Sequence, residues 1–308
     1  MRITCAFPES EAEQLAWVNA LRRALPEARV EGWRSGDAPA DYAVVWRAAQ
    51  PFFDAQPELK AIFNAGAGVD GLARCTLPPS AVLVRIEDAG MAEQMADYVT
   101  HAVLHYYREF DTYAAQAGNA EWRPRAPRNK AQYPVGLLGF GVLGQAVAKT
   151  LMALGFPVHA WTRLPREHDE VRLYAGQGQL PQFLAATRML VCLLPLTAQT
   201  SGLLDRRHLS MLQQGAYLIN VARGGHVVQS ELLEAIDMGQ IAGATLDVCE
   251  PEPLPGDHPF WRHPRIRLTP HISAATLREP AVAQIAEKLR QIEAGMNVTG
   301  IVRHGRGY

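Results

Sequence analysis

Short apolar runs, rich in β-branched residues, alternate with helical patterns along the whole chain. Strands that are joined by helices usually pair in parallel, so this alternation predicts an α/β fold with parallel sheets. In the first third we expect strands at Ile3–Phe7, Tyr42–Trp46, Lys60–Asn64 and Val82–Ile86, and the clearest helix at Glu9–Leu25.

A long helical pattern then runs from about Met91 to Ala117, and a loop rich in Pro, Arg and Asn, residues 119–134, follows it. This loop is a candidate domain boundary. After it the alternation restarts, and the expected strands are Val135–Leu138, Val158–Trp161, Met189–Leu194, Ala216–Val221, Gly243–Val248 and Ile266–Thr269. From Ala274 the pattern predicts a last helix that ends near Gly295.

The length of the chain, 308 residues, suggests two domains, and with 48% apolar residues each can bury a core of its own. The first and last segments fit one domain with the middle of the chain inserted as the other, and the long helix suits a crossing between them. We therefore expect two Rossmann-like domains with parallel sheets. The smaller would comprise residues 1–98 and 275–308, and the larger, residues 99–274, would be inserted into it.

The balance of charge excludes some classes of partner. Lys and Arg number 30 against 31 Asp and Glu, which gives a net charge of −1. Nucleic-acid-binding proteins normally carry an excess of Lys and Arg, so no nucleic-acid partner is expected. No apolar stretch approaches the roughly 18 residues that span a bilayer, and the start of the chain lacks the long apolar region of a signal peptide. We therefore expect no membrane partner.

The cysteines and histidines predict neither disulfides nor metal ligands. The four cysteines, Cys5, Cys75, Cys192 and Cys249, form no CxxC pair, which favours a reducing, cytoplasmic location. His101 and His105 have a spacing that can bind zinc, but the glutamate of HExxH and a third ligand are missing. No metal site is expected.

The segment PVGLLGFGVLGQAVAKTLMALGF, residues 134–156, contains the pattern GxGxxG at Gly139, Gly141 and Gly144. An apolar run precedes the glycines and a helix with one apolar face follows them. The first glycine permits a tight turn, the second lets a pyrophosphate approach the backbone, and the third lets helix and strand pack closely. The N-terminus of the helix offers free N–H groups to phosphates. The pattern predicts a dinucleotide site; the alternative is an ordinary tight turn.

About twenty residues further on, where such proteins usually carry an acid, the chain has Thr162, Arg163 and Arg166. A carboxylate there would bind the ribose 2′-hydroxyl of NAD, whereas the Arg163 guanidinium can bind a 2′-phosphate. Thr162 adds a hydroxyl donor and Arg166 a second positive charge. We therefore expect NADP(H) as the preferred cofactor and NAD(H) as the lesser one. The alternative is that Arg163 is a solvated surface arginine and the cofactor is NAD.

Three further apolar strands are each followed by charged or titratable groups. Arg223 follows the run AYLINV, Asp247 and then Glu252 follow GATL, and His271 follows IRLTP. In an open α/β sheet, ligands bind outside the carboxyl ends of the strands. We therefore expect Arg223, Glu252 and His271 to converge on a cofactor that is bound at the glycine turn.

Each of these residues also has a structural interpretation. Arg223 could be a surface charge after its strand, and Glu252 a solvated carboxylate in a proline-rich loop. His271 could cap a helix that starts near Ser273, and Asp247 could be a structural aspartate at the end of a strand. Together and in register with the glycine turn, Arg223, Glu252 and His271 favour a catalytic site, and the structural interpretation of Asp247 stays open.

The segments GFGVLG, NVARGG, LDVCEPEPLP and TPHIS, in this order, resemble the D-isomer-specific 2-hydroxyacid dehydrogenases, and the resemblance covers essentially the whole chain. Within that family, WRAAQPFF (46–53), NAGAGVD (64–70), EDAGMAEQMADYV (87–99) and the closing RGY are most similar to the bacterial glyoxylate/hydroxypyruvate reductase A group. Two positions depart from the family pattern. Ser273 stands where relatives often have glycine, and Cys249 where they often have Phe or Tyr.

The resemblance implies that glyoxylate or hydroxypyruvate is reduced by hydride transfer from NADPH. His271 would protonate the 2-keto oxygen, Glu252 would fix the His271 tautomer and favour its imidazolium, and Arg223 would bind the keto oxygen and the carboxylate. The smaller domain would be flavodoxin-like, with the active site in the cleft between the domains. The resemblance also implies a homodimer formed through the cofactor domain.

The same resemblance implies residues that would bind the substrate. Backbone N–H groups around Ala67, Gly68 and Val69 would hold its carboxylate. Trp46 and Met91 would border the space for its tail, although both residue types more often pack in a core.

It also implies further cofactor contacts. Asp247 would hold the nicotinamide carboxamide, with the Ala222 carbonyl as a second contact. The other cofactor contacts would be Val142, Leu143, Leu194, Pro195, Thr200 and Ser273.

Two other functions remain open from the sequence. One is a related dehydrogenase for another substrate, of the phosphoglycerate or D-lactate type, and Arg163 weighs against its usual NAD-dependent members. The other is a dinucleotide-sensing binding protein with negligible reductase activity, which the intact set of Arg223, Glu252 and His271 disfavours.

Overall fold

The computed structural model describes residues 1–8, 10–72 and 74–302. The chain divides into two compact units: Met1–Met91 together with the segment from Ala275 onward, and Ala92–Ala274. The loop 119–134 lies inside the second unit, so its prediction as a domain boundary is wrong. Glu9, the first residue of the first predicted helix, and the closing RGY lie outside the described residues.

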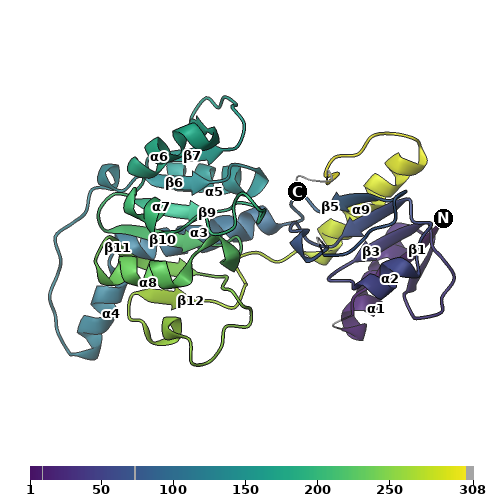
Figure 1. The fold of residues 1–308 in the computed structure, drawn as a ribbon, viewed down its shortest axis with the longest axis horizontal. Helices are drawn as coiled ribbons and strands as arrows, with labels where there is room; N and C mark the ends of the chain where they lie inside the picture. The colour runs from purple at the N-terminus through teal and green to yellow at the C-terminus, as the bar shows by residue number, and fades with distance from the viewer. Residues whose placement is uncertain (9, 73, 303–308) are drawn as a thin grey trace. The chain divides into compact units, whose positions relative to one another are not determined.

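The first unit contains a five-stranded parallel sheet with the order β2-β1-β3-β4-β5. Its strands are β1 Arg2–Ala6, β2 Arg29–Gly32, β3 Tyr42–Val45, β4 Ala61–Asn64 and β5 Val82–Arg85. Its helices are α1 Glu11–Ala24, α2 Gln50–Asp54 and α9 Arg278–Glu293. Figure 1 shows α9, in yellow, beside the purple strands from the start of the chain. This strand order is the flavodoxin-like one.

The second unit contains a seven-stranded parallel sheet with the order β12-β11-β10-β9-β6-β7-β8. Its strands are β6 Val135–Leu138, β7 Val158–Thr162, β8 Arg172–Ala175, β9 Met189–Cys192, β10 Ala216–Asn220, β11 Ile241–Leu246 and β12 Ile266–Leu268. Its helices are α3 Met91–Tyr107, α4 Phe110–Gly118, α5 Val142–Ala153, α6 Gly176–Ala185, α7 Arg206–Ser210 and α8 Gln229–Asp237. Counted from β6, the first six strands follow the Rossmann order, and the order reverses between β6 and β9. The predicted α/β class with two parallel Rossmann-type sheets is confirmed.

The apolar strands of the second unit are buried on both faces. On β6, Leu138 packs with residues of α6, α7 and α8, whereas Leu137 packs with residues of α3 and α5. Successive side chains of a strand point to opposite faces, so a continuous apolar run is what a sheet between two layers of helices requires. This is why the sequence shows unbroken apolar runs here.

The long helix predicted from Met91 to Ala117 is two helices, α3 and α4, because the chain turns at Glu109. Glu109 has a φ of 58°, in the left-handed region. Arg125 and Arg128 each donate to its carboxylate at 2.7 Å, so the turn is stabilised by a loop that follows later in the chain. The last helix begins at Arg278 rather than near Ala274.

Within the described ranges, no helix combines the length and the apolar character needed to cross a membrane. The four cysteines are all free. Among the described residues, no group of three or more His, Cys, Asp or Glu could hold a metal ion. His105, one of the two histidines with zinc spacing, lies against Asp111 at 3.1 Å and against the ring of Phe110.

Candidate active site

The glycine turn joins β6 to α5 and has the geometry that the sequence predicts. Gly139 has a φ of 104°, and a Cβ there would lie 3.0 Å from the Leu193 carbonyl oxygen. A Cβ on Gly144 would lie 2.5 Å from the Gly139 carbonyl oxygen. A Cβ on Gly141 would meet no described atom within 4 Å. The fold itself therefore requires the first and third glycines, whereas the second borders open space, where a ligand could approach the backbone.

Helix α5 begins at this turn without a side-chain cap. Its first backbone bond runs from the Gln145 N–H to the Gly141 carbonyl, at 2.9 Å. The N–H groups of Val142, Leu143 and Gly144 precede that bond and point out of the helix end. These donors and the positive end of the helix dipole can bind a phosphate.

The end of β7 places basic residues beside the turn. The Arg166 guanidinium donates to the Phe140 carbonyl and lies 5.0 Å from the centre of the Phe140 ring. The Thr162 hydroxyl is buried and donates to the Leu164 carbonyl at 2.9 Å, so it shapes this loop. Arg163 is exposed at the end of the strand. The loop that follows β7 therefore carries two guanidinium groups, one of them in contact with the glycine turn.

The segment after β9 flanks the glycine turn on its other side. The Leu193 N–H donates to the Leu138 carbonyl at 2.8 Å, and Leu194 is buried directly after it. The Thr200 hydroxyl donates to the Pro195 carbonyl at 2.7 Å. Thr200 thus closes a loop directly beside the point where the strand order reverses, which is where such sheets bind ligands.

Arg223 lies in a turn after β10 that a buried asparagine holds. The Asn220 side-chain amide donates to the Arg223 carbonyl at 2.9 Å, and its oxygen accepts from the Ala222 N–H at 3.2 Å. The Arg223 guanidinium donates to the Ala222 carbonyl at 2.7 Å. The Asn220 side chain therefore fixes the backbone of this turn. The Arg223 side chain is only partly buried.

Gly224 lets this turn pack directly on the turn after β11. A Cβ on Gly224 would lie 2.0 Å from the carbonyl carbon and oxygen of Cys249. The Cys249 N–H in turn donates to Glu252 Oε1 at 3.1 Å. Burial and the carboxylates of Glu252 and Asp247 raise the pKa of the Cys249 thiol to about 11, so this thiol stays protonated.

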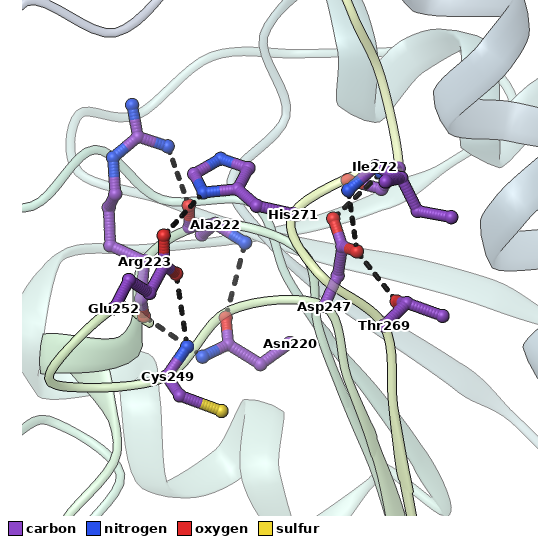
Figure 2. A network of polar contacts seen from close by, with 10 residues as sticks. Asn220, Ala222, Arg223, Asp247, Cys249, Glu252, Thr269, His271 and Ile272 are labelled. Atoms are coloured by element: carbon purple, nitrogen blue, oxygen red, sulfur yellow. Dashed lines mark hydrogen bonds and ion pairs between the residues drawn. The ribbon is translucent and has the colours of Figure 1, made fainter. Parts of the chain in front are cut away.

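His271 and Glu252 are joined by a hydrogen bond. Nδ1 of His271 lies 2.8 Å from Glu252 Oε2, and the two side chains are 36% and 35% exposed. Figure 2 shows the side chains of Arg223, Glu252 and His271 gathered at one end of the polar network. The structure therefore brings the three predicted catalytic residues together, from turns after three different strands. His271 does not cap a helix, because α9 begins seven residues later, at Arg278.

Asp247 lies at the other end of this network and is 1% exposed. Its Oδ1 accepts from the Thr269 hydroxyl at 2.6 Å and from the Ile272 N–H at 2.8 Å. Its Oδ2 accepts from the Ser273 N–H at 2.8 Å. Both oxygens therefore bind the loop that carries His271, as a structural aspartate would.

In the first unit, taken by itself, the loop after β4 is also held by a buried asparagine. The Asn64 amide donates to the carbonyls of Gly66 and Gly68, at 2.9 and 2.8 Å. Among the described residues, no acceptor lies in hydrogen-bond range of the N–H groups of Ala67, Gly68 and Val69. Three consecutive unpaired donors of this kind can bind a carboxylate.

Trp46 and Met91 are the other predicted substrate residues. A Cβ on Gly66 would lie 2.4 Å from the Trp46 ring, so this glycine lets the ring pack on the loop. Met91 is 5% exposed, and the Thr276 hydroxyl lies 3.6 Å from its sulfur. Trp46 is partly exposed, whereas Met91 is packed inside the first unit.

Four residues that shape these loops were missed from the sequence: Asn64, Asn220, Gly224 and Thr269. Both asparagines end an apolar run directly before a turn, a position where asparagine commonly bonds to that turn. That signal was available. The roles of Gly224 and Thr269 depend on contacts with other strands, which leave no local signal.

A family model for the NAD-binding domain of D-isomer specific 2-hydroxyacid dehydrogenases matches residues 100–273. Glyoxylate/hydroxypyruvate reductase A from Yersinia enterocolitica is 44% identical to this chain, over 100% of both proteins. The enzyme of the same name from Salmonella paratyphi B is 46% identical, over 95% of this chain and 96% of that protein.

Solved structures show the same similarity. A D-isomer specific 2-hydroxyacid dehydrogenase from Xanthobacter autotrophicus Py2, in complex with NADPH and MES, has a TM-score of 0.93 and 37% identity, over 100% of this chain and 99% of that chain. An NADPH-dependent glyoxylate/hydroxypyruvate reductase from Sinorhizobium meliloti, in complex with NADP and sulfate, has a TM-score of 0.91 and 33% identity over the same shares.

Proposed function

The chain belongs to the D-isomer specific 2-hydroxyacid dehydrogenase family, and we propose that it reduces small 2-keto acids with NADPH, glyoxylate to glycolate and hydroxypyruvate to glycerate. The observation that carries this proposal is the hydrogen-bonded pair of His271 and Glu252 beside Arg223. A proton donor, a carboxylate that orients it and a guanidinium are the groups that reduction of a keto acid needs. Relatives that bear this activity in their names match the chain over its whole length.

The residues at the glycine turn fit NADP(H). Gly141 leaves its backbone open, and the first turn of α5 has free N–H groups for the pyrophosphate. At the end of β7, Arg163 and Arg166 stand where an NAD-specific site has a carboxylate, and two guanidinium groups suit a 2′-phosphate. Thr162 holds the backbone of this loop. We assign the second unit to the cofactor and the first unit to the substrate.

NADPH, when bound, supplies a hydride to the 2-keto carbon. Arg223 binds the keto oxygen and a carboxylate oxygen of the substrate through two N–H groups of its guanidinium. This contact draws electron density from the keto carbon and stabilises the negative charge that develops on the oxygen. The Asn220 and Gly224 contacts keep the turn rigid, so that the guanidinium is held in position before the substrate binds.

His271 supplies the proton. Its Nδ1 lies 2.8 Å from Glu252 Oε2, so Nε2 is the ring nitrogen that is left to face the substrate. In the reduction, Nε2–H of the imidazolium donates its proton to the keto oxygen as that oxygen becomes a hydroxyl. Glu252 stabilises the imidazolium before the transfer and fixes the ring throughout. In the reverse direction, neutral Nε2 accepts the hydroxyl proton.

We assign the remaining substrate and cofactor contacts to residues by considering each loop separately. The N–H groups of Ala67, Gly68 and Val69 hold the substrate carboxylate, and Trp46 and Met91 limit the size of its tail. Asp247 and Ser273 contribute to the nicotinamide end of the cofactor site. The remaining proposed cofactor contacts are Gly139, Gly141, Val142, Leu143, Gly144, Leu194, Pro195, Thr200 and Ala222.

A steady-state comparison tests the function directly. Glyoxylate, hydroxypyruvate and pyruvate are each assayed with NADPH and with NADH. We expect the largest kcat/KM for glyoxylate or hydroxypyruvate with NADPH. Tight NADPH binding without turnover of any of these keto acids would contradict the proposal, and so would a preference for NADH.

Arg163→Ala tests the cofactor preference. Loss of a charge-assisted bond to a phosphate should raise the KM for NADPH about 10- to 30-fold and leave the KM for NADH nearly unchanged. Arg172→Ala is the matched control, since Arg172 is also an exposed arginine and lies over the ring of Tyr174, on β8. Equal effects of Arg163→Ala on both cofactors would contradict a phosphate contact.

We also propose a homodimer formed through the second unit. Trp122, in the loop after α4, is 98% exposed, and Phe110 and Tyr113 on α4 are exposed as well. Exposed aromatic side chains of this kind are typical of protein interfaces. Sedimentation equilibrium measures the assembly, and a monomer at micromolar concentration would contradict it.

The free cysteines support a cytoplasmic site of action.

A further inference from the structure

A chain of hydroxyl groups connects helix α3 with the loop that carries His271. The Thr269 hydroxyl donates to Asp247 Oδ1 at 2.6 Å, and the Tyr98 hydroxyl lies 2.5 Å from Thr269 Oγ1. A threonine hydroxyl has one hydrogen, which here points to Asp247, so Tyr98 must donate to Thr269. Burial raises the pKa of Tyr98 to about 12, so its hydroxyl keeps the proton that it donates.

The backbone at His271 needs support of this kind. Its φ of 57° is in the left-handed region, which is unfavourable for a residue with a Cβ. The His271 N–H donates to the Asp247 carbonyl at 2.8 Å, and the next two N–H groups donate to the Asp247 carboxylate. Asp247 therefore holds three successive residues of the loop by their backbone.

The Asp247 carboxylate is buried, and the contacts found for it are three hydrogen bonds. Two of the three donors are the N–H groups of the His271 loop itself, and the third is Thr269. Loss of the Thr269 donor would leave a buried charge with only the donors that it has to position. Such a loss destabilises the buried carboxylate and loosens the loop whose N–H groups it binds.

We propose that Thr269 and Tyr98 are positioning residues for His271. They fix Asp247, and Asp247 fixes the backbone from which the imidazole reaches Glu252. The inference rests on the proposed function, in which His271 is the proton donor. It assigns to α3, the helix at whose start the chain passes from the first unit to the second, a role in placing that donor.

The test compares Thr269→Val with Thr269→Ser. Valine keeps the shape and removes the hydroxyl, whereas serine keeps the hydroxyl. With hydroxypyruvate and NADPH, Thr269→Val should lower kcat about 10- to 100-fold, because a displaced catalytic group loses that much rate. Thr269→Ser should stay within about threefold of the natural protein, and Tyr98→Phe should lower kcat about 3- to 10-fold. The KM for NADPH should change less than about threefold in all three.

The chain offers a matched control. Tyr217 on β10 and Thr245 on β11 form another tyrosine–threonine pair, with their hydroxyls 2.9 Å apart. No contact that the structure gives links this pair to Asp247. Thr245→Val also removes a threonine hydroxyl that pairs with a tyrosine, and it should leave kcat within about twofold.

A second readout needs no catalysis. Amide hydrogen exchange of Ile272 and Ser273, measured without cofactor, should speed up about tenfold or more in Thr269→Val and in Tyr98→Phe, but not in Thr245→Val. Unchanged exchange at these two amides in both variants would overturn the inference. If Thr269→Val does not fold, Tyr98→Phe and Thr269→Ser decide the outcome.

The outcomes separate this inference from the proposed function. If the natural protein reduces keto acids but Thr269→Val has full kcat, the inference fails alone. A rise in the dissociation constant of NADPH at unchanged kcat would also overturn it, because Thr269 would then support only the proposed cofactor contact of Asp247 and not the position of His271. If the natural protein reduces no keto acid, the proposed function fails, and the exchange experiment still decides whether the chain of hydroxyls holds the loop.

Discussion

Two loops of the molecule, one in each unit, are built on the same device and present different chemistry. Asn64 ends β4 and Asn220 ends β10, and they are 2% and 0% exposed. Each asparagine donates to the carbonyls of the loop that follows it, at 2.8–2.9 Å. A buried side-chain amide at the end of a parallel strand thus fixes a turn at the edge of the sheet where ligands bind.

The loops differ in what they present once they are fixed. The loop after Asn64 has small residues, and within the part of the chain that the structure describes no hydrogen bond is found for the N–H groups of Ala67, Gly68 and Val69. The loop after Asn220 presents the guanidinium of Arg223 instead. The backbone donors can only bind an anion, whereas a guanidinium can also follow the charge that develops on a reacting oxygen. We infer that the first loop serves binding and the second serves catalysis.

Arg223→Gln tests the catalytic role of the second loop and gives the largest expected loss of activity. The variant keeps two N–H donors but loses the charge and the paired geometry, so kcat/KM for hydroxypyruvate should fall about 10²- to 10³-fold. Arg223→Lys keeps the charge alone and should recover only a small part of the loss. Steady-state kinetics measures both, with NADPH affinity as the control. Full activity of the lysine variant would show that charge suffices.

Gly224→Ala tests whether the catalytic turn depends on its backbone packing. A Cβ would overlap the Cys249 carbonyl at 2.0 Å, so the turn must move and Arg223 with it. We expect kcat to fall about 100-fold. The control is Gly225→Ala, whose Cβ would lie 3.2 Å from the end of the flexible Leu196 side chain and 3.9 Å from Glu250 Oε2. Similar losses in the two variants would argue against a specific role for the contact with Cys249.

The asparagines themselves give the smallest expected effects and the sharpest contrast. Loss of a buried hydrogen bond amounts to about 1 kcal/mol, or about fivefold. Asn64→Ala should raise the KM for the keto acid about fivefold with kcat nearly unchanged, and Asn220→Ala should lower kcat about fivefold with that KM nearly unchanged. Full kinetic profiles with NADPH at saturation distinguish these patterns. The same pattern in both variants would remove the distinction between a binding loop and a catalytic loop.

The sequence was sufficient to predict the strands that are buried on both faces of the sheet. The runs at 135–138, 189–192 and 216–220 are unbroken and apolar because helices cover both sides of these strands. The edge strands β2 and β8 were missed, because only Val30 and Tyr174 are buried in them and no apolar run forms. The break at Glu109 was missed because arginines of a later loop stabilise it, without a local Gly or Pro.

Prediction of the candidate site has the same limit, because contacts between distant segments leave no local signal in the sequence. Arg223, Glu252 and His271 could be grouped from the sequence because parallel strands place their carboxyl ends at one edge of the sheet. The role of Asp247 in holding the His271 loop could not be predicted from the sequence. It depends on N–H groups about 25 residues away, which only the folded chain brings near.

The central claim is that His271 gives the proton that completes reduction of the keto acid. Its most direct test is the rate of NADPH oxidation by His271→Asn in a single turnover with hydroxypyruvate, measured together with the dissociation constant of NADPH. The account predicts a fall in rate of about 10²- to 10⁴-fold at a dissociation constant that changes less than about threefold. A rate close to that of the natural protein, or a loss of NADPH binding that explains the lost rate, would contradict it.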